Sequence, residues 1–269
     1  MKKFRIYPNA YYNYKQQRKF DYLQGKEDAM QKISKIYHAH KGVPGYRMIR
    51  YYLAKEEIPL SLLTVHKYMN TELKLYSVTR RKGPDYRKGT PHKIFDNLLK
   101  QNFTAENINE KWCTDFTYLF LKNGEKRYNC TIIDLHDRSV VASITDRRMT
   151  SNLAIRTIKK AFESQGIQKA DGLILHSDQG SQFTSKEFVE FCEKVGIKQS
   201  MSKAGYPYDN APMERYFNTL KSELIYQHVY ETESALYEAI ETYAYKEYNT
   251  RRPHSFNNGK TPFQARYCA

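Results

Sequence analysis

The sequence predicts an α/β protein in which a mixed five-stranded sheet is flanked by helices and follows a small helical domain of helix-turn-helix type. Three observations support this fold class. Apolar residues recur at helical spacing through residues 27–73, aromatic and β-branched residues cluster from Trp112, and strand and helix patterns alternate from there to about residue 201. A chain of 269 residues is long enough for one substantial core and a smaller satellite domain.

Apolar periodicity interrupted by breakers outlines the helical domain. A helix is expected over residues 27–40, and a glycine-proline turn separates it from a second helix that begins near Tyr46. Pro59 closes the second helix, and Ser61 is placed as the N-cap of a third. Residues 1–78 are therefore assigned to a helix-turn-helix-like region.

Positive charge is concentrated in this region and just beyond it. The chain has 44 Lys and Arg against 29 acidic residues, a formal net charge of +15, and an excess of eight positive charges lies between Lys41 and Lys93. Such a distribution favours DNA, because a basic stretch with breakers can lie along a phosphate backbone. Residues 79–108 are assigned to a basic linker, for which a solvated spacer is the alternative. The candidate DNA-binding residues of the two regions are Arg47, Arg50, Lys67, Arg80, Arg81 and Lys82.

Strand signals dominate the next part of the chain. Aromatic and β-branched residues fill positions 112–121, and Asn123-Gly124 is a strong hairpin signal. Two further strands are expected at residues 128–135 and 140–144, so three consecutive antiparallel strands are predicted.

Helices and strands then alternate. A helix over residues 154–162 leads to a buried strand at 173–175, and Thr184 with Glu187 forms a capping box for the next helix. A fifth strand is expected at residues 198–201. The remaining expectations are helices over 211–227 and 233–248, followed by an irregular tail from Pro253.

Cysteine usage and hydropathy exclude several classes of protein. The four cysteines include no Cys-x-x-Cys pair, which argues against a zinc ribbon and against a disulfide scaffold. No apolar run approaches the roughly 20 residues needed to span a bilayer, and the N-terminus lacks the apolar segment of a signal peptide. A soluble protein of the reduced cytoplasm is expected, without a membrane partner.

Three acidic residues occupy positions suited to metal chemistry. Asp115 falls inside the first strand, Asp178 just after the fourth, and Glu214 on the helix after the fifth. In open α/β sheets ligands gather beyond the carboxyl ends of strands. Carboxylates are the ligands that Mg²⁺ prefers, and two divalent ions can cleave or join phosphodiesters without a protein nucleophile. Taken singly, each of these acids is more often a turn, cap or solvated residue.

Three segments give these acids a shared context. They are Trp112-Cys113-Thr114-Asp115-Phe116-Thr117-Tyr118, His176 to Ser185, and Tyr208-Asp209-Asn210-Ala211-Pro212-Met213-Glu214. They resemble the catalytic blocks of insertion-sequence transposases related to retroviral integrases, and the 35 residues between Asp178 and Glu214 match the spacing that names that family's acidic triad. In particular, the chain resembles products of the second reading frame of the insertion sequence 3 family. Residues 27–80 and the tail from Tyr248 to His254 resemble its helix-turn-helix segment and C-terminal block.

The resemblance implies a fold and an activity. It implies a ribonuclease H-like integrase catalytic core over residues 109–228, followed by a C-terminal helix and tail over 229–269. The implied enzyme is a divalent-metal-dependent polynucleotidyl transferase that cleaves and transfers DNA strands during transposition. Mg²⁺ or Mn²⁺, about two ions per site, would be held by Asp115, Asp178 and Glu214.

The resemblance also implies partners and a location. The partners are transposon ends, target DNA, further copies of the chain in a homo-oligomer on DNA, and the upstream reading frame product. The location is the bacterial cytoplasm, in association with the nucleoid. Two departures leave an alternative open, an inactive or truncated relative that occupies transposon DNA. The chain lacks the heptads and terminal-repeat-binding domain of the upstream frame, and it lacks the His-His-Cys-Cys zinc module of retroviral integrases.

Four other residues are candidates for the site. Lys221 lies seven residues after Glu214, close to two helical turns, so it is expected to contact a DNA phosphate unless it is merely solvated or ion-paired. Asp134 is expected to be a structural hydrogen-bonding or ion-paired residue. His176 is either structural or a ligand-orienting residue, and Glu223 is a weaker rival of Glu214.

Two other classes of recombinase fit the sequence less well. Tyrosine recombinases need a His-x-x-Arg element, which does not occur in the chain. Rolling-circle nucleases use a His-hydrophobe-His strand, but His38-Ala39-His40 falls in a predicted helix. The three acids therefore favour the metal-dependent class.

Overall fold

The computed structural model of the chain describes residues 8–78, 93–203 and 206–268. The chain divides into two compact units, one within residues 1–79 and the other within 80–269. Much of the expected basic linker, including Arg80, Arg81 and Lys82, falls on residues 79–92, outside the described residues. Leu99, from the later part of that segment, is buried in the core of the second unit.

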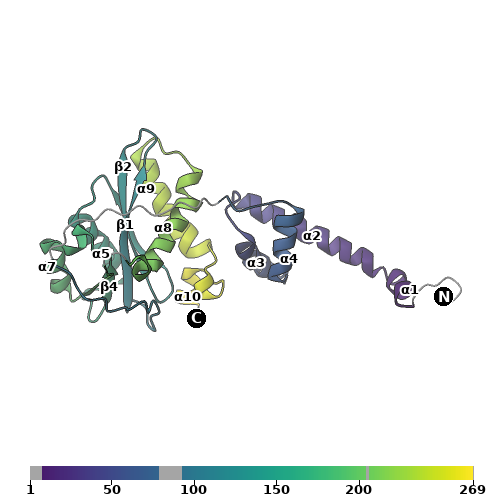
Figure 1. Cartoon of the computed structure of the whole chain (residues 1–269), viewed down its shortest axis with the longest axis horizontal. Helices are drawn as coiled ribbons and strands as arrows, with labels where there is room; N and C mark the ends of the chain where they lie inside the picture. Colours follow the sequence, from purple (N-terminus) through teal and green to yellow (C-terminus); the bar gives the residue numbers. More distant parts are fainter. Residues whose placement is uncertain (1–7, 79–92, 204–205, 269) are drawn as a thin grey trace. The chain divides into compact units, whose positions relative to one another are not determined.

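The first unit is helical (Figure 1). Its elements are α1 (Pro8–Lys15), α2 (Arg18–Ala39), α3 (Tyr46–Lys55), α4 (Leu62–His66) and the π-helical η2 (Lys67–Glu72). Ile33, Ile49, Leu53 and Met69 are fully buried in its core. As expected, Ser61 caps α4, accepting a hydrogen bond from the Thr64 amide at 3.1 Å.

Helix α2 begins nine residues before its expected start at residue 27. The apolar stripe marks only the packed half of the helix, since the buried residues of α2 are Ala29, Ile33, Ile36 and Tyr37. The preceding turns of the helix are exposed, so their sequence has no apolar periodicity from which a helix could be predicted. For the same reason α1 was not expected.

The second unit contains the predicted mixed five-stranded sheet. Its strands are β1 (Lys111–Phe120), β2 (Lys126–Asp134), β3 (Val140–Asp146), β4 (Ile174–Ser177) and β5 (Lys198–Met201). Their order is β3-β2-β1-β4-β5. The first three strands pair antiparallel, and β4 and β5 add in parallel beside β1.

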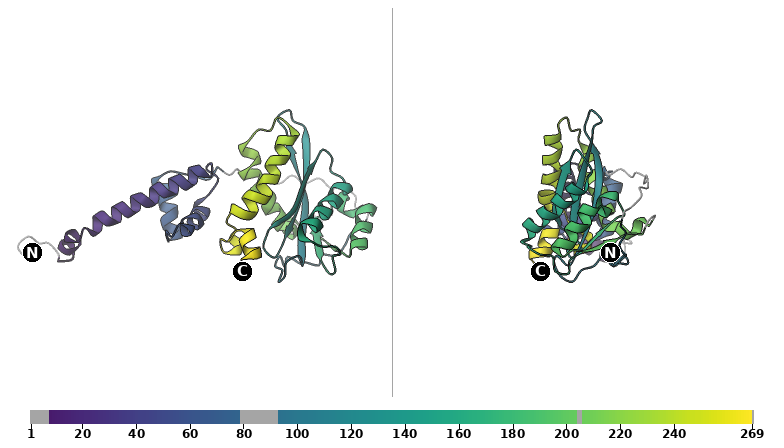
Figure 2. Two further views of the ribbon diagram at one scale, coloured as in Figure 1. Left: turned by 180° about the vertical axis from the view of Figure 1, so that it is seen from behind. Right: turned by 90° about the vertical axis from the view of Figure 1, so that its left-hand side faces the viewer.

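Helices cover both faces of the sheet (Figure 2). They are α5 (Ser151–Gln165), α6 (Ser181–Thr184), α7 (Lys186–Val195), η3 (Pro207–Asn210), α8 (Ala211–Glu223), η4 (Ile225–Gln227), α9 (Glu233–Thr242), η5 (Tyr243–Arg251), η6 (Ser255–Asn257) and α10 (Pro262–Tyr267). Side chains alternate along β1, so Trp112 joins the core on the α5 and α7 face while Cys113 joins the core under α8 and η5. One face thus carries α8 across β1.

Several helix boundaries follow the sequence signals. Gly166 and Gly196 end α5 and α7 in left-handed conformations, with φ of 64° and 83°, which a residue without a side chain adopts at little cost. The expected capping box at Thr184 was wrong by one residue. Ser185 is the N-cap of α7 and accepts from the Phe188 amide, whereas the Thr184 hydroxyl donates to the Gly180 carbonyl within α6.

The end of the chain is more regular than expected. The helix that begins with α9 continues as η5 to Arg251, and the tail contains α10. Thr261 and Gln264 form a capping box at the start of α10. The expectation of an irregular tail from Pro253 onward was therefore wrong for residues 262–267, which form α10. The capping box was missed because the surrounding proline and glycine residues indicate loops.

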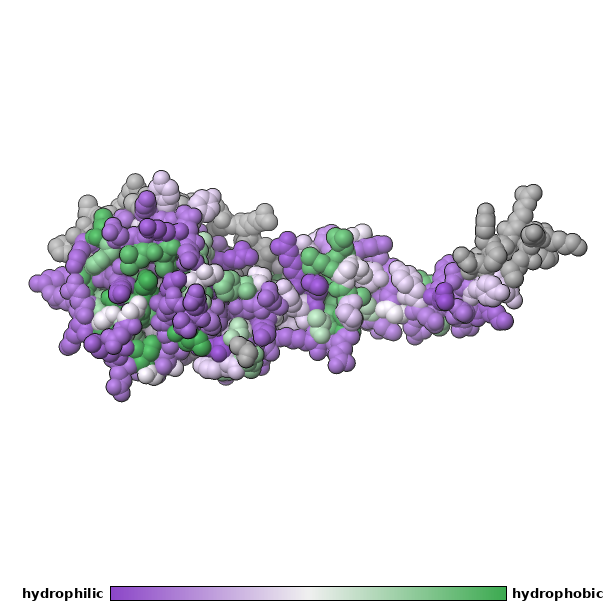
Figure 3. Space-filling model, turned by 90° about the horizontal axis from the view of Figure 1, so that it is seen from below, coloured by the Kyte–Doolittle hydropathy of each residue, from purple (hydrophilic) through white to green (hydrophobic). Residues whose placement is uncertain are grey.

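Hydrophilic residues predominate on the surface seen in Figure 3, and hydrophobic residues gather in patches on each unit. Among the helices that the structure describes, none combines the length and apolar character needed to cross a membrane.

Candidate active site

The fold brings the three candidate acids from separate elements to one side of the sheet. Strands β1 and β4 are parallel, with Cys113 opposite His176, so Asp115 in β1 and Asp178 just after β4 extend the same register. Glu214 lies in the first turn of α8, which packs on β1. The predicted positions of these residues on a strand, a strand end and a helix are those the structure shows.

Asp178 and Glu214 both act electrostatically on Asp115. Burial raises the pKa of Asp115 well above its usual range, and the neighbouring charges of Asp178 and Glu214 raise it further. The Phe116 amide donates to the Asp115 carboxylate at 2.7 Å and opposes this rise, as does the Lys221 ammonium. Desolvation by the surrounding protein also raises the pKa values of Asp178 and Glu214, although both residues are exposed to solvent.

A close backbone approach shapes the segment after Asp178. The Gly180 amide donates to the Asp178 carboxylate at 2.9 Å. A Cβ atom at position 180 would lie 2.9 Å from that same carboxylate oxygen, closer than real Cβ atoms come. Glycine is therefore needed here for Asp178 to keep its orientation.

Polar contacts anchor the segment that leads into α8. The buried His176 ring contacts the Ser200 hydroxyl at 2.8 Å through Nδ1 and the Asp209 carbonyl at 2.9 Å through Nε2. Burial lowers the pKa of His176. Next to Asp209, the Asn210 side-chain amide donates to the Thr114 carbonyl, one residue before Asp115. These contacts tie the start of α8 to β4 and β1, and they favour the structural interpretation of His176.

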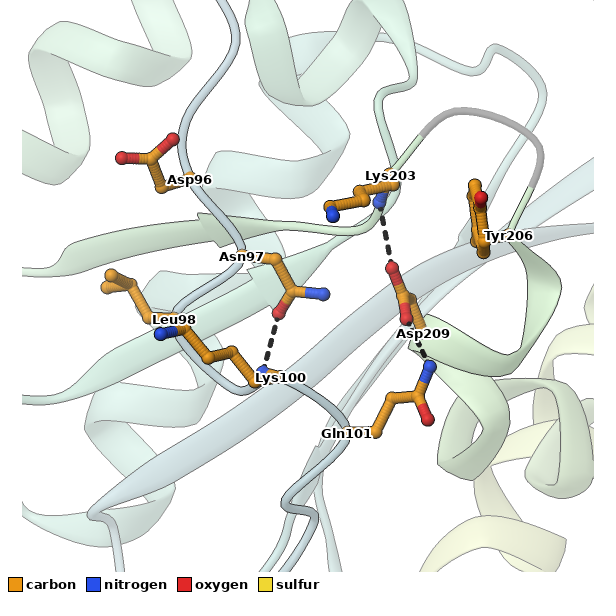
Figure 4. A pocket seen from close by; sticks show the side chains of 8 residues that line it. All are labelled: Asp96, Asn97, Leu98, Lys100, Gln101, Lys203, Tyr206 and Asp209. Atoms are coloured by element: carbon orange, nitrogen blue, oxygen red, sulfur yellow. Dashed lines mark hydrogen bonds between the residues drawn. The ribbon is translucent and has the colours of Figure 1, made fainter.

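Asp209 is a positioning residue that the sequence did not single out. Its carboxylate accepts from the Gln101 side chain at 2.9 Å and from the Lys203 amide at 3.0 Å (Figure 4). Burial alone would raise the pKa of Asp209, but these hydrogen bonds outweigh it and the pKa is lowered. The residues line a cavity of about 610 Å³ that also includes Lys100 and Tyr206. In the sequence, the one indication of a role for Asp209 was its position in the segment from Tyr208 to Glu214.

The donor set fits a hard divalent cation. All three side chains offer carboxylate oxygens, which Mg²⁺ and Mn²⁺ prefer, and a dication would stabilise the ionised form of Asp115 against the burial and the repulsion that raise its pKa. Across the described ranges 8–78, 93–203 and 206–268, no three His, Cys, Asp or Glu side chains are already gathered as a metal-binding group.

Comparison with known proteins gives the family. Two integrase core domain models match residues 105–207 and 195–262, and an HTH-like domain model matches residues 24–83. The putative transposase InsK of insertion sequence element IS150 from Escherichia coli is 34% identical over 89% of this chain and 83% of its own length. The transposase of insertion sequence element IS904 from Lactococcus lactis is 35% identical over 88% of this chain and 92% of its own length. Transposase InsF of insertion sequence IS3A from Escherichia coli is 30% identical over 79% and 73%, respectively.

This chain belongs to the insertion sequence 3 family of transposases. Its fold is also that of a chain in the simian T-cell lymphotropic virus intasome in complex with the PP2A regulatory subunit B56 gamma. That match has a TM-score of 0.50 and 19% identity, covering 87% of this chain and 74% of the other. The expectation of a ribonuclease H-like integrase core preceded by a helix-turn-helix-like domain is thus confirmed.

In this transposase the rival acid Glu223 is already engaged. Its carboxylate accepts from Arg252 Nε and Nη2 at 2.9–3.0 Å and from the Tyr243 hydroxyl at 2.7 Å. Asp134 is fully buried and pairs with Arg266, which agrees with its expected structural role. Neither carboxylate offers free oxygens as Glu214 does at the surface of α8.

The basic candidates lie on both units. Lys221 is on α8, with its Nζ atom 5.4 Å from the centroid of the Tyr118 ring, and it acts electrostatically on Asp115. Arg47 and Arg50 are exposed on α3, and Lys67 is exposed at the start of η2. These placements leave the three residues of the first unit accessible to a ligand.

Proposed function

We propose that this transposase cleaves DNA strands and joins them to target DNA, with Asp115, Asp178 and Glu214 as the ligands of divalent metal. The observation that carries the proposal is that Asp178, after β4, and Glu214, in the first turn of α8, both lie near enough to Asp115 in β1 to raise its pKa. Family membership supports the reaction class.

Metal binding would give the site its chemistry. Mg²⁺ or Mn²⁺, about two ions per site, would activate the attacking oxygen and stabilise the leaving oxygen of a phosphodiester. Asp115 and Asp178 are fixed by backbone hydrogen bonds from Phe116 and Gly180, so their oxygens are held in place before any ligand arrives. Glu214 depends on the anchored start of α8 for its position.

DNA contacts would come from cations on both units. Lys221 would contact a phosphate beside the acids, a role that positions the strand and carries little base information. Arg47, Arg50 and Lys67, with Arg80, Arg81 and Lys82 of the linker, would bind duplex DNA through its backbone. We further propose that transposon ends and target DNA are both substrates and that copies of the chain assemble on them. The upstream reading frame product is a further proposed partner, and the bacterial nucleoid is the proposed location.

The test is a strand-transfer assay with the purified full chain and DNA from the element's own ends. Activity should require Mg²⁺ or Mn²⁺ and vanish in the near-isosteric variants Asp115→Asn, Asp178→Asn and Glu214→Gln. Asp171→Asn is the matched control, because Asp171 is exposed in the loop before β4. Full activity in all three site variants would refute the assignment.

A further inference from the structure

The second half of β1 carries two large aromatic side chains that are exposed to solvent. Side chains alternate along the strand, so Tyr118 and Phe120 project from the same face as Trp112 and Phe116. Trp112 is fully buried, and the Phe116 ring packs against Phe183 of α6 with centroids 5.2 Å apart. By contrast, Tyr118 is 49% exposed and Phe120 is 51% exposed. The packed layer on this face therefore ends between Phe116 and Tyr118.

The two exposed rings form one surface with their neighbours on β2. Tyr118 and Phe120 lie edge to face, with centroids 6.5 Å apart and ring planes at 76°. The half-buried Tyr128 is opposite Tyr118 in the register of β1 and β2, and the exposed Lys126 is opposite Phe120. Residues directly opposite each other on antiparallel strands project to the same side of the sheet. Three aromatic side chains and a lysine therefore lie side by side on one face.

This aromatic surface begins close to the carboxylates of the proposed metal site. Pairing between β1 and β4 ends at Cys113, so Asp115 and Tyr118 both lie in the part of β1 that extends beyond β4. Tyr118 follows Asp115 by three residues, which is about 10 Å along the strand. Lys221 of α8 lies over the Tyr118 ring, with its Nζ atom 5.4 Å from the ring centroid. A cation thus accompanies the aromatic surface at the end nearer to the acids.

Aromatic rings beside lysines have the chemistry that binds a nucleotide. Every base has a π-face that stacks on an aromatic ring, and a lysine attracts the adjoining phosphate. The formal net charge of +15 on the chain favours such a polyanion. Inside a duplex the faces of each base are covered by the neighbouring bases, so a protein ring stacks on a base that is unpaired. At about 3.4 Å per nucleotide, a distance of about 10 Å corresponds to about three nucleotides.

We propose that Tyr118 and Phe120 form a stacking site for an unpaired base of the DNA strand held at the carboxylates, about three nucleotides from the bond that is cleaved. Lys221 would hold the phosphate beside this base, and Lys126 would add a second contact with the backbone. The inference rests on the proposed function, because the base belongs to the strand on which the metal site acts. It adds a requirement for the substrate, which must be unpaired near the cleavage site.

The first test compares two single-stranded oligonucleotides in EDTA, oligothymidylate and an abasic strand with the same number of phosphates. The double variant Tyr118→Leu/Phe120→Leu of the full chain should bind oligothymidylate about tenfold more weakly than the wild type, because it loses base stacking. Its salt slope and its binding of the abasic strand should not change, because no charge is removed.

The matched control is Phe263→Leu/Tyr267→Leu, which removes another exposed aromatic pair, on α10, with centroids 4.5 Å apart. This control should bind both strands like the wild type. Unchanged binding of oligothymidylate by Tyr118→Leu/Phe120→Leu, or an equal loss in the control, would overturn the proposal.

The second test locates the base in the wild-type chain and so does not depend on the folding of a variant. DNA from the element's own end carries 5-iodouracil in an unpaired overhang, about three nucleotides from the cleavage site. Irradiation in EDTA should crosslink this base to the tryptic peptide 112–122, which contains both rings. The same label deep in the duplex should give no crosslink to that peptide. Crosslinks from the overhang to other peptides alone would show that the stacking site does not exist.

A second copy of the chain is the other occupant to be tested. If Tyr118→Leu/Phe120→Leu lowered the oligomeric state of the chain without DNA, as measured by analytical ultracentrifugation, the surface would hold protein and the proposal would be wrong. Neither the binding test nor the crosslinking test involves catalysis. Absent strand transfer in the wild type would therefore refute the proposed function alone, whereas an active enzyme without the crosslink would refute the stacking site alone.

Discussion

Replacement of Arg266 by Met should strongly destabilise the second unit. Arg266 Nη1 lies 3.0 Å from Asp134 Oδ2 and 2.5 Å from Asp137 Oδ2. The Arg266 side chain is 4% exposed, and those of the two acids are 0% and 1% exposed. Through these two ion pairs, Arg266 holds α10 against the end of β2 and the turn that follows β2.

The magnitude follows from the two charges left behind. Removal of one partner from a buried ion pair costs about 3–5 kcal/mol, because the remaining charge is desolvated without compensation. Here two acids lose the one arginine with which they form an ion pair among the described residues, so the upper part of that range is expected. Total stabilities of domains are about 5–15 kcal/mol. The second unit of Arg266→Met should therefore be only marginally stable.

Urea unfolding followed by tryptophan fluorescence is the suitable assay. The chain has one tryptophan, Trp112, which is fully buried in the second unit, so the signal reports that unit alone. Arg251→Met is the control, because its exposed pair with Glu247 is worth only about 0.5 kcal/mol. Adding Asp137→Asn to Arg266→Met should recover part of the loss. If Arg266→Met costs no more than Arg251→Met, the stabilising role of the buried pair is refuted.

Three further predictions concern pH and DNA. The pKa of His254 in the folded protein is lowered to about 3 by burial and neighbouring arginines, so as pH falls below about 6.5 His254 takes up a proton in the unfolded chain but not yet in the folded protein. Stability contributed by neutral His254 is present above that pH, and about 2 kcal/mol of it should be lost by pH 5 in urea titrations; an equal loss in His254→Asn would contradict this. Lys221→Ala should sharply reduce strand transfer while leaving folding intact and Lys221→Arg should retain part of the activity, whereas full activity of Lys221→Ala would show that strand transfer does not depend on this side chain. A chain beginning at Phe95 should bind duplex DNA more weakly and with a smaller salt slope than the full chain, and equal binding would remove residues 41–93 from the DNA-binding surface.

The sequence predicts the catalytic unit well where signals are local. β-Branched runs, the Asn123-Gly124 hairpin signal and the glycines at 166 and 196 place most elements, and with them Asp115, Asp178 and Glu214. Apolar periodicity does not predict helical turns that bury no side chains, as in the exposed first half of α2.

Contacts between distant parts of the chain could not be predicted. Arg266 and Asp134 are 132 residues apart, and nothing near either residue indicates that they pair. The contact between Arg138 and Phe256 likewise depends on how the tail returns to the sheet. Asp209 lay within a recognised motif, but its anchoring role depends on Gln101, which is remote in sequence.

Binding of Mn²⁺ to the full chain with duplex DNA present tests the shared metal site most directly. Calorimetry should detect saturable binding in the wild type and in the exposed control Asp171→Asn. The site requires that Asp115→Asn, Asp178→Asn and Glu214→Gln each lose this binding at concentrations that saturate the wild type, because each removes an oxygen ligand from the same ion or ions. Wild-type binding in all three variants would show that these carboxylates do not hold the metal.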